Sequence, residues 1–435
     1  MDVVPSFREL VQTLSGVMTR PTFAAFLTLL TGWVFTRRRT VTGMLQAAGV
    51  VGKRHHAAYH RVFATAQWSL DALGLAVFRL LVPWLPPGTV FLAVDDTLAR
   101  KRGTTMYGVG MHHDPLASSR KHTVVSWGHS WVVLGVLVPF PFRADHWFCL
   151  PVLCRLYRSQ QTHAREGGRY RTRPELAVEL LQVLAEAFPA RAFHVVADAA
   201  YGGHQVVQAL PRNCDLTSRL HLDARLHAVP PARRPGTKGR TRVRGERLPT
   251  PRQMLTQRAQ RLQLQLYGYT DRSRVVTAVA RLYAVPGRPV TVVAVEPLRG
   301  GRPLQAFFAT VAEATATDVL TWYARRWALE QTFHDSKQQL GFEQPQNWTR
   351  QAVERTAPVA LLLYSLIAVW FAQHGHATYR KPPRPWYRGK AGIGFTDMLA
   401  TLKRDSLQRI LTTLGDTPHK KKLLQPLVFA VAQAA

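Results

Sequence analysis

Two apolar runs that end in carboxylates constrain the fold of this chain more than any other feature. The run TVFLAVDD ends in Asp95 and Asp96, and the run AFHVVADAAYGG reaches Asp198 just before a glycine-rich turn. The first run is continuously apolar and the second is mostly apolar, a pattern typical of strands buried on both faces of a sheet. We therefore expect an α/β fold with acidic side chains at the ends of two buried strands, where open sheets bind ligands.

The segments around these runs complete the α/β pattern. Residues 1 to about 85 show apolar positions at helical spacing, interrupted by turns. A helix is predicted at 174–188, with Pro174 near its first position. Further strands are predicted at 127–140, 147–157 and 214–220, of which the second could also run on into a helix.

The α/β order breaks at about residue 224. The arginine-rich stretch at 232–252 has no periodicity, and we interpret it as a loop that is either a solvated insertion or a DNA contact. Three strand-like segments follow, with Gly or Asp at their turns, which indicates an inserted antiparallel β module. The chain then returns to helix, with Thr317 or Asp318 as the predicted helix cap.

The charge of the chain favours a polyanionic partner. Lysine and arginine number 57 against 26 aspartates and glutamates, a net charge of +31 at pH 7. Such a surplus repels itself in a compact protein unless a polyanion neutralises it, and nucleic acid is the commonest large polyanion. Residues 37–63 also have the outline of a helix-turn-helix, although a helical bundle with a basic surface is the alternative. Its second helix would carry Lys53, Arg54, His55, His56, His60 and Arg61.

Cysteine content and hydropathy indicate the cellular compartment that we expect for the protein. The three cysteines fit neither a disulfide framework nor a zinc pair, so we expect buried thiols in a reducing cytosol. The first residues lack the charged and apolar regions of a signal peptide. The most apolar run, 357–373, is shorter than the roughly 20 residues that span a bilayer, and we interpret it as a buried helix rather than a membrane contact.

The segment YARRWALEQTFHDSKQQL is predicted to form one amphipathic helix with a polar stripe. At roughly 100° per residue, its spacings of three, four and seven place four side chains within an arc of about 60°. These are Tyr323, Arg326, Glu330 and Lys337. A neighbouring apolar stripe, suited to burial, consists of Trp322, Leu329, Phe333 and Leu340. The alternative is a solvated face on which Arg326 and Glu330 form an ion pair worth a few tenths of a kcal/mol.

The acidic positions suggest a metal site. Carboxylates at the ends of two buried strands and on a late helix, Asp95 or Asp96, Asp198 and Glu330, could together hold two Mg²⁺ ions. Two such ions about 4 Å apart would activate a water or a 3′-hydroxyl for in-line displacement at phosphorus. Taken singly, each aspartate is as well explained by a turn or a helix cap.

Histidines and tryptophans near the first aspartates offer weaker candidates. His112, His113, Asp114 and His129 fit no standard zinc spacing, so core or turn histidines are the favoured interpretation. Aromatic rings can stack on unpaired bases, but core packing is favoured for Trp127, Trp131 and Trp147.

At these residues the chain resembles a known family. YARRWALEQTFHDSK matches the Y-x2-R-x3-E-x6-K signature of the cut-and-paste DDE transposases of bacterial insertion sequences, the insertion-sequence-four-like group. VDDTL resembles their first Asp motif, VVADAAYG their second, and LTSRLHLDARLH the strand and turn that follow. The resemblance extends from about residue 40 to 375 and includes the order of the segments.

This resemblance implies an RNase H-like catalytic core in which Asp95, Asp198 and Glu330 bind two Mg²⁺ ions, or Mn²⁺ in their place. Tyr323, Arg326 and Lys337 would hold phosphates near the scissile end. The usual spacing to the following threonine selects Asp95 over Asp96. The implied domains are a helical DNA-binding domain at 1–85, core segments at 86–223 and 313–375, a basic loop and β insertion at 224–312, and a basic helical C-terminal region at 376–435.

The implied function is transposition in the bacterial cytoplasm, in association with the nucleoid. The protein would bind the terminal inverted repeats of its element, cleave there, and join the 3′-hydroxyls to target DNA. Paired ends imply a homodimer on double-stranded DNA. The alternatives are a catalytically inactive or domesticated transposase-derived DNA-binding protein, and a metal-dependent nuclease without strand transfer.

Overall fold

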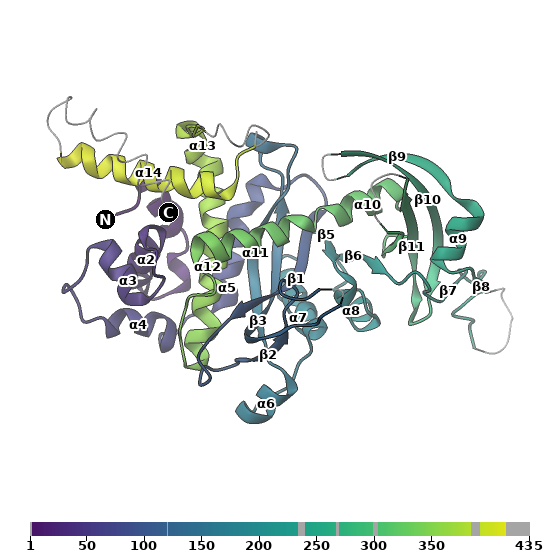
Figure 1. Cartoon of the computed structure of the whole chain (residues 1–435), viewed down its shortest axis with the longest axis horizontal. Coiled ribbons are helices and arrows are strands. Elements are labelled where there is room, and N and C mark those ends of the chain that lie inside the picture. Colours follow the sequence, from purple (N-terminus) through teal and green to yellow (C-terminus); the bar gives the residue numbers. More distant parts are fainter. Residues whose placement is uncertain are drawn as a thin grey trace. The chain divides into compact units, whose positions relative to one another are not determined.

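The computed structural model describes residues 2–119, 121–233, 240–266, 269–298, 303–383 and 392–414 (Figure 1). The chain forms two compact units. The first comprises Met1–Leu85, Asp96–Arg171 and Glu330–Ala435, and the second comprises Pro86–Asp95 and Thr172–Leu329. Strand β1 (Val90–Arg100) and helix α11 (Trp327–Leu340) each contain a boundary between the units. The predicted basic stretches at 232–252 and 376–435 lie partly outside the described residues.

Short helices form the N-terminal part of the first unit, as the apolar spacing predicts. Most of α2 is buried, and Gly32 allows α3 to approach it closely, since a Cβ there would lie 1.9 Å from the Met44 carbonyl oxygen. Gly49, with a φ of 69°, ends α3 in the left-handed conformation that glycine favours. The helices are α1 (Pro5–Gln12), α2 (Arg20–Phe35), α3 (Val41–Ala48), α4 (Ala57–Ala64) and α5 (Leu70–Leu81), with 3₁₀ turns η1 (Ser15–Val17) and η2 (Val82–Trp84).

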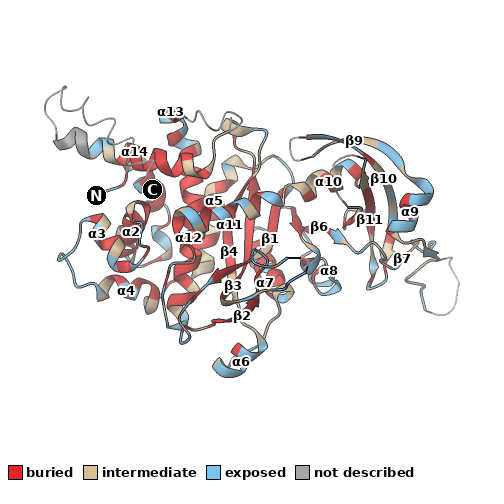
Figure 2. Ribbon diagram, viewed as in Figure 1, coloured by how far each residue is buried: buried red, intermediate tan, exposed pale blue. Residues whose placement is uncertain are grey.

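Helix α12 (Arg350–Trp370) is the central helix of the first unit. Arg350–Thr378 is long and apolar enough to cross a membrane, but 89% of its most apolar window is buried inside the protein. Figure 2 shows this burial along most of α12. The prediction of a buried helix is therefore confirmed. Beyond it lie the π-helical turn η5 (Phe371–Gly375), α13 (His376–Thr378) and α14 (Phe395–Leu414).

The sheet of the first unit is antiparallel. Strand β3 (Val125–Val138) pairs with β2 (Gly110–His113) and with β4 (Phe148–Tyr157). These strands confirm the predictions at 127–140 and 147–157, and the helix after the second strand, α6 (Gln160–Glu166), begins separately behind a Ser159 cap. Helix α12 packs on β4, where the Ser365 hydroxyl donates to the Pro151 carbonyl.

The sheet of the second unit is mixed. Strand β5 (Phe193–Ala197) pairs in parallel with β1 and with β6 (Cys214–Leu220), as expected for buried α/β strands. Antiparallel strands then continue from β6 in the order β12-β11-β10-β7-β8. Their bounds are β7 (Leu226–His227), β8 (Arg247–Leu248), β9 (Gln260–Leu266), β10 (Tyr269–Leu282), β11 (Val285–Pro297) and β12 (Gln305–Ala309), with β9 beside β10.

Four α-helices and one 3₁₀ turn accompany this sheet within its described residues. Helix α7 begins with the Thr172–Glu175 capping box, which confirms the predicted helix with an early proline. Helix α9 was not expected; it begins at the end of the arginine-rich stretch, and the Thr250–Gln253 capping box starts it. The elements are α7 (Arg173–Ala187), η4 (Ala199–Tyr201), α8 (His204–Ala209), α9 (Pro251–Arg258) and α10 (Ala316–Ala324).

The prediction that β1 ends at its aspartates was wrong. The strand continues through Thr97, Leu98 and Ala99, which are buried, to Arg100. A β-branched and two apolar residues fit a buried strand, so the acidic pair does not end it. Asp95 and Asp96 thus lie in the middle of a strand, on opposite faces.

Arg355 of α12 holds the turn between α4 and α5 in the first unit. Its guanidinium donates to the carbonyls of Phe63, Ala66 and Trp68 at 3.4, 2.7 and 2.6 Å. Arg355→Met keeps the apolar stem but leaves these acceptors without their donor, so we expect a loss of about 2–4 kcal/mol. A thermal melt should show a lower Tm.

The exposed Arg350, on the same helix, supplies the matched control. Arg350→Met removes an exposed ion pair with Glu354 and an exposed cation–π contact with Tyr107, and its effect should stay below about 1 kcal/mol. Equal melting temperatures for the two variants would contradict a stabilising role of Arg355.

Candidate functional site in the two units

Two of the three predicted catalytic carboxylates come together in the second unit. The parallel register of β1 and β5 pairs Val94 with Ala197, and Asp95 and Asp198 are the next residues of these strands. Residues that follow a matched pair on parallel strands lie at the same level, although β1 continues past Asp95 while β5 ends at Ala197. The register therefore brings together two aspartates that are far apart in the sequence.

Each aspartate already has protein partners. Arg326 Nη1 donates to Asp95 Oδ2 at 2.5 Å, and only about 15% of each side chain is exposed. Asp198 caps the turn η4, where its Oδ1 accepts from the Ala200 amide at 2.9 Å. The Ser218 hydroxyl donates to the Asp198 backbone carbonyl. Asp198 thus caps the turn η4 and also lies beside Asp95.

Tyr323 and Arg326 belong to the same group. The Arg326 guanidinium lies 5.7 Å from the centroid of the Tyr323 ring. Burial raises the pKa of the Tyr323 phenol, with a smaller contribution from the negative charge of Asp198, while Arg326 and Arg219 act in the opposite direction. The second unit therefore gathers two carboxylates, a phenol and a guanidinium near the C-terminal end of β5.

The prediction of one continuous helix over 323–340 was wrong. Helix α10 ends at Ala324 and α11 begins at Trp327, with a turn at Arg325 and Arg326. In this turn the amides of residues 325, 326, 328 and 329 donate to carbonyls three residues earlier. Such tight turns advance by about 120° per residue rather than 100°, so the helical spacing on which the predicted polar stripe depends is interrupted at this turn.

A ring contact accompanies the break after α10, and a capping box starts that helix. Arg325 lies over the Phe91 ring at 4.2 Å, and burial lowers its pKa to about 10. The start of α10 is capped by Thr315 rather than by Thr317 or Asp318. Asp318 is instead the reciprocal partner of Thr315 in a capping box, one turn into the helix.

Glu330 and Lys337 lie on α11, in the first unit. Glu330 is half-buried on a helix anchored by Thr332, whose hydroxyl donates to the Cys149 carbonyl at 2.7 Å. Lys337 Nζ donates to the Leu98 carbonyl at 2.7 Å and lies 3.5 Å from Glu343 Oε1. Burial lowers the pKa of Lys337. Lys337 thus fastens α11 to the second half of β1.

The donor set suits a hard divalent cation by its chemistry. The predicted ligands are all carboxylates, which are the groups that Mg²⁺ and Mn²⁺ prefer. Within the described parts of the chain, no group of three His, Cys, Asp or Glu side chains is placed to hold a metal ion. The metal assignment of Asp95, Asp198 and Glu330 therefore stays a prediction.

The predicted DNA-binding residues near the N-terminus differ in their setting. Lys53 and Arg54 lie in the turn between α3 and α4, whereas the prediction placed them on the second helix. Gly49 and Gly52 both adopt positive φ, which lengthens the turn at the expense of the helix. Arg61 lies on α4, and all three basic side chains are exposed.

Asp114 and Trp131, two of the weaker candidates from the sequence, have structural roles in the first unit. Asp114 is buried and accepts hydrogen bonds from Arg100 and Ser126, both at 2.6 Å. Trp131 is 1% exposed, in the core. The three cysteines, Cys149, Cys154 and Cys214, are buried free thiols, as expected.

The fold and the similarity to known proteins indicate the same class of protein. A mixed sheet, parallel where its two aspartates meet, is consistent with an RNase H-like core. Residues 13–278, more than half of the 435 residues, match the DDE superfamily endonuclease family, so the chain belongs to that superfamily. The matched segment contains Asp95 and Asp198 and ends before Glu330.

One relative carries a more specific description. A probable transposase for insertion sequence element IS701, from Microchaete diplosiphon, is 24% identical over 180 residues. The aligned region covers 41% of this chain and 43% of that protein. The similarity thus spans less than half of either protein.

His129 provides a test of the buried polar region near β3. Its Nε2 lies 2.9 Å from the Tyr107 carbonyl, so this nitrogen carries the proton. Burial, together with the charge of Lys101, lowers the pKa of His129 from 6.5 to about 3. Between these values the unfolded chain binds the additional proton, so stability falls as the pH drops below 6.5, by up to about 1.4 kcal/mol per pH unit.

His129→Gln should therefore flatten the loss of stability between pH 6.5 and pH 4 in urea unfolding experiments. The exposed His113 is the control, since His113→Gln should leave the slope unchanged. Identical pH profiles for native protein and His129→Gln would refute this assignment.

Proposed function

We propose that this chain is a DDE-type transposase that cleaves DNA at the ends of its own element and joins the 3′-hydroxyls to target DNA. The observation that carries the proposal is the matched position of Asp95 and Asp198 on parallel strands, in a chain that belongs to the DDE superfamily. The signature spacing of Tyr323, Arg326, Glu330 and Lys337 supports the same function, as does the similarity to the probable transposase of IS701.

In this proposal Asp95, Asp198 and Glu330 hold two Mg²⁺ ions, or Mn²⁺ in their place. When bound, such ions supply an activated water or 3′-hydroxyl and stabilise the leaving oxygen. Arg326 and Tyr323, beside Asp95, orient the phosphate of the scissile strand through a forked guanidinium and a hydroxyl. Because Arg326 also pairs with Asp95, it holds the carboxylate in place until substrate binds.

The partner is double-stranded DNA, both as element ends and as target. The charge of +31 supports this, and the exposed Lys53, Arg54 and Arg61 are the proposed contacts to the terminal inverted repeats. Two ends must be cut in one complex, so a homodimer on DNA is part of the proposal. The protein would act in the bacterial cytoplasm, at the nucleoid.

The test is a cleavage assay on a plasmid that carries the gene with its flanking sequence, with Mg²⁺ or Mn²⁺. Glu330→Gln and Asp95→Asn should each reduce cleavage by orders of magnitude and leave DNA binding nearly intact, because they remove one metal-binding oxygen. Glu313→Gln, on an exposed carboxylate, is the matched control and should cleave normally.

Asp96→Asn decides between the two adjacent aspartates. If Asp95 is the ligand, Asp96→Asn keeps most of the cleavage rate; the reverse result would assign Asp96. Binding without cleavage by the native protein would favour a catalytically inactive or domesticated DNA-binding protein. Cleavage without joined products, when target plasmid is supplied, would indicate a nuclease without strand transfer.

Lys337 allows a separate prediction. If the Lys337 ammonium contacts a phosphate, DNA binding by Lys337→Ala should depend less on salt than binding by the native protein. The slope of log K for DNA binding against log salt should be smaller by about 0.9 or less. Its bond to the Leu98 carbonyl predicts a lower melting temperature in the same variant. An unchanged slope with a lowered Tm would leave Lys337 only the role of fastening α11.

A further inference from the structure

One large aromatic side chain of the first unit is exposed on a fixed backbone. Trp348 is 68% exposed, although tryptophan is among the most favourable side chains to bury. Its loop is held from two sides: Lys101 Nζ donates to the carbonyls of Glu343 and Pro345, both at 2.7 Å, and the Tyr107 amide donates to the Trp348 carbonyl at 3.0 Å. An exposed ring on a fixed loop is preorganised for a partner, because little ordering remains to be done on binding.

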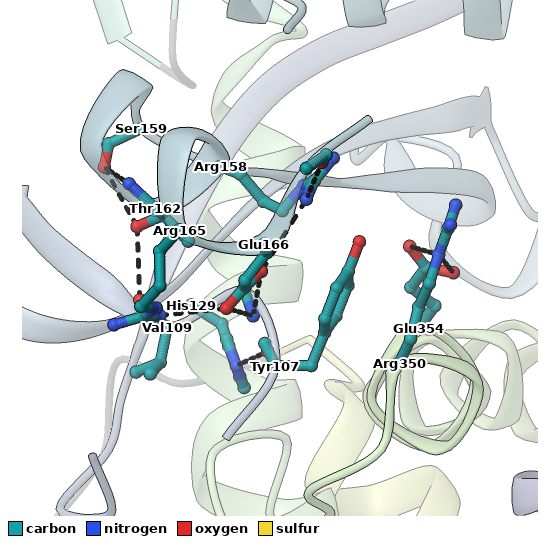
Figure 3. Close-up of polar contacts among 12 residues, drawn as sticks. Tyr107, Val109, His129, Arg158, Ser159, Thr162, Arg165, Glu166, Arg350 and Glu354 are labelled. Atoms are coloured by element: carbon teal, nitrogen blue, oxygen red, sulfur yellow. Dashed lines mark hydrogen bonds and ion pairs between the residues drawn. The ribbon is translucent and has the colours of Figure 1, made fainter. Parts of the chain in front are cut away.

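Cationic groups frame Tyr107, the residue that holds the Trp348 backbone. Figure 3 shows the Tyr107 ring standing between the Arg158–Glu166 pair and the Arg350–Glu354 pair. The guanidinium groups of Arg158 and Arg350 lie 5.3 and 5.7 Å from the ring centroid, within the range of a cation–π contact.

The two arginines differ in how firmly they are held. Arg158 is 14% exposed and donates to the Gly167 carbonyl, and its partner Glu166 also accepts from the Gly108 amide and from Arg165. Arg350 is 68% exposed and pairs with Glu354 at 3.3 Å, on the helix surface. Such surface pairs are weak and screened by salt, so the Arg350 guanidinium can exchange its carboxylate for a phosphate.

We propose that Trp348 and Arg350 form a contact for a DNA strand with an unpaired nucleotide, with Tyr107 and Arg158 as its support. The indole stacks on the face of the unpaired base, and Arg350, two residues further on, contacts the backbone phosphate. The excess of positive charge favours a polyanion over a protein partner. This proposal rests on the proposed DNA function and assigns it a strand-end or single-stranded feature, since bases inside a duplex do not expose their faces.

Binding of the full chain to three fluorescent oligonucleotides tests this contact: a blunt duplex, the same duplex with a short single-stranded overhang, and the single strand. Trp348→Ala should weaken binding to the overhang and single-strand probes about tenfold, and change duplex binding less than twofold. Trp348→Phe should retain most of the affinity because it keeps an aromatic face. A 2-aminopurine in the overhang should be quenched by the native protein but not by Trp348→Ala.

Arg350→Gln should weaken binding to all three probes and reduce the slope of log K for binding against log salt by about 0.7–0.9. Leu116→Ala, which removes another highly exposed apolar side chain of the first unit, is the matched control and should bind like the native protein.

The outcomes separate this inference from the proposed function. If the native protein binds none of the probes, the DNA function itself fails. If it binds them and Trp348→Ala binds equally well, only this inference is overturned, and a protein contact becomes the use of Trp348. An equal loss of affinity for all three probes in Trp348→Ala would also overturn the inference, because stacking on an unpaired base should affect the overhang and single-strand probes more than the blunt duplex.

Discussion

The parallel pairing of β1 with β5 is the constraint on which the candidate site depends. It places Asp95 beside Asp198 because the strands run in the same direction and are matched at Val94 and Ala197. A shift of one residue would turn every side chain of a strand to the opposite face. The buried residues before each aspartate, Val90 and Leu92–Val94 in β1 and all of β5, hold the two strands in this register.

The same half-buried location explains why Arg326 pairs with Asp95. A carboxylate out of water requires a compensating charge or several hydrogen bonds. Arg326 provides this from the turn between α10 and α11, and the tight turn directs its side chain toward β1 rather than along the face of a helix. The break in the helix is therefore part of how the site is built.

Part of the positive charge of the chain stabilises the fold. With 57 basic against 26 acidic residues, many cations cannot find a carboxylate, and several are bonded to backbone carbonyls instead. Lys101 and Arg355 hold a loop and a turn of the first unit in this way, and Lys337 bonds to the Leu98 carbonyl while it also pairs with Glu343. Part of the basic surplus thus stabilises the fold, and only the exposed remainder, such as Arg61 and Arg350, is available to DNA.

The sequence by itself determined the class of fold and most of its elements. The apolar runs predicted β1, β3, β4 and β5, and the helical pattern with an early Pro174 predicted α7, because burial and helix starts leave local patterns. Tertiary structure decided the rest: that β1 continues past its aspartates, that α10 and α11 are separate helices, and that Lys53 and Arg54 lie in a turn. The first two features depend on contacts between distant residues, such as Lys337 with Leu98 and Arg326 with Asp95, and the turn depends on the positive φ of Gly49 and Gly52. Periodicity records only which side chains share a face of one element, and therefore cannot reveal them.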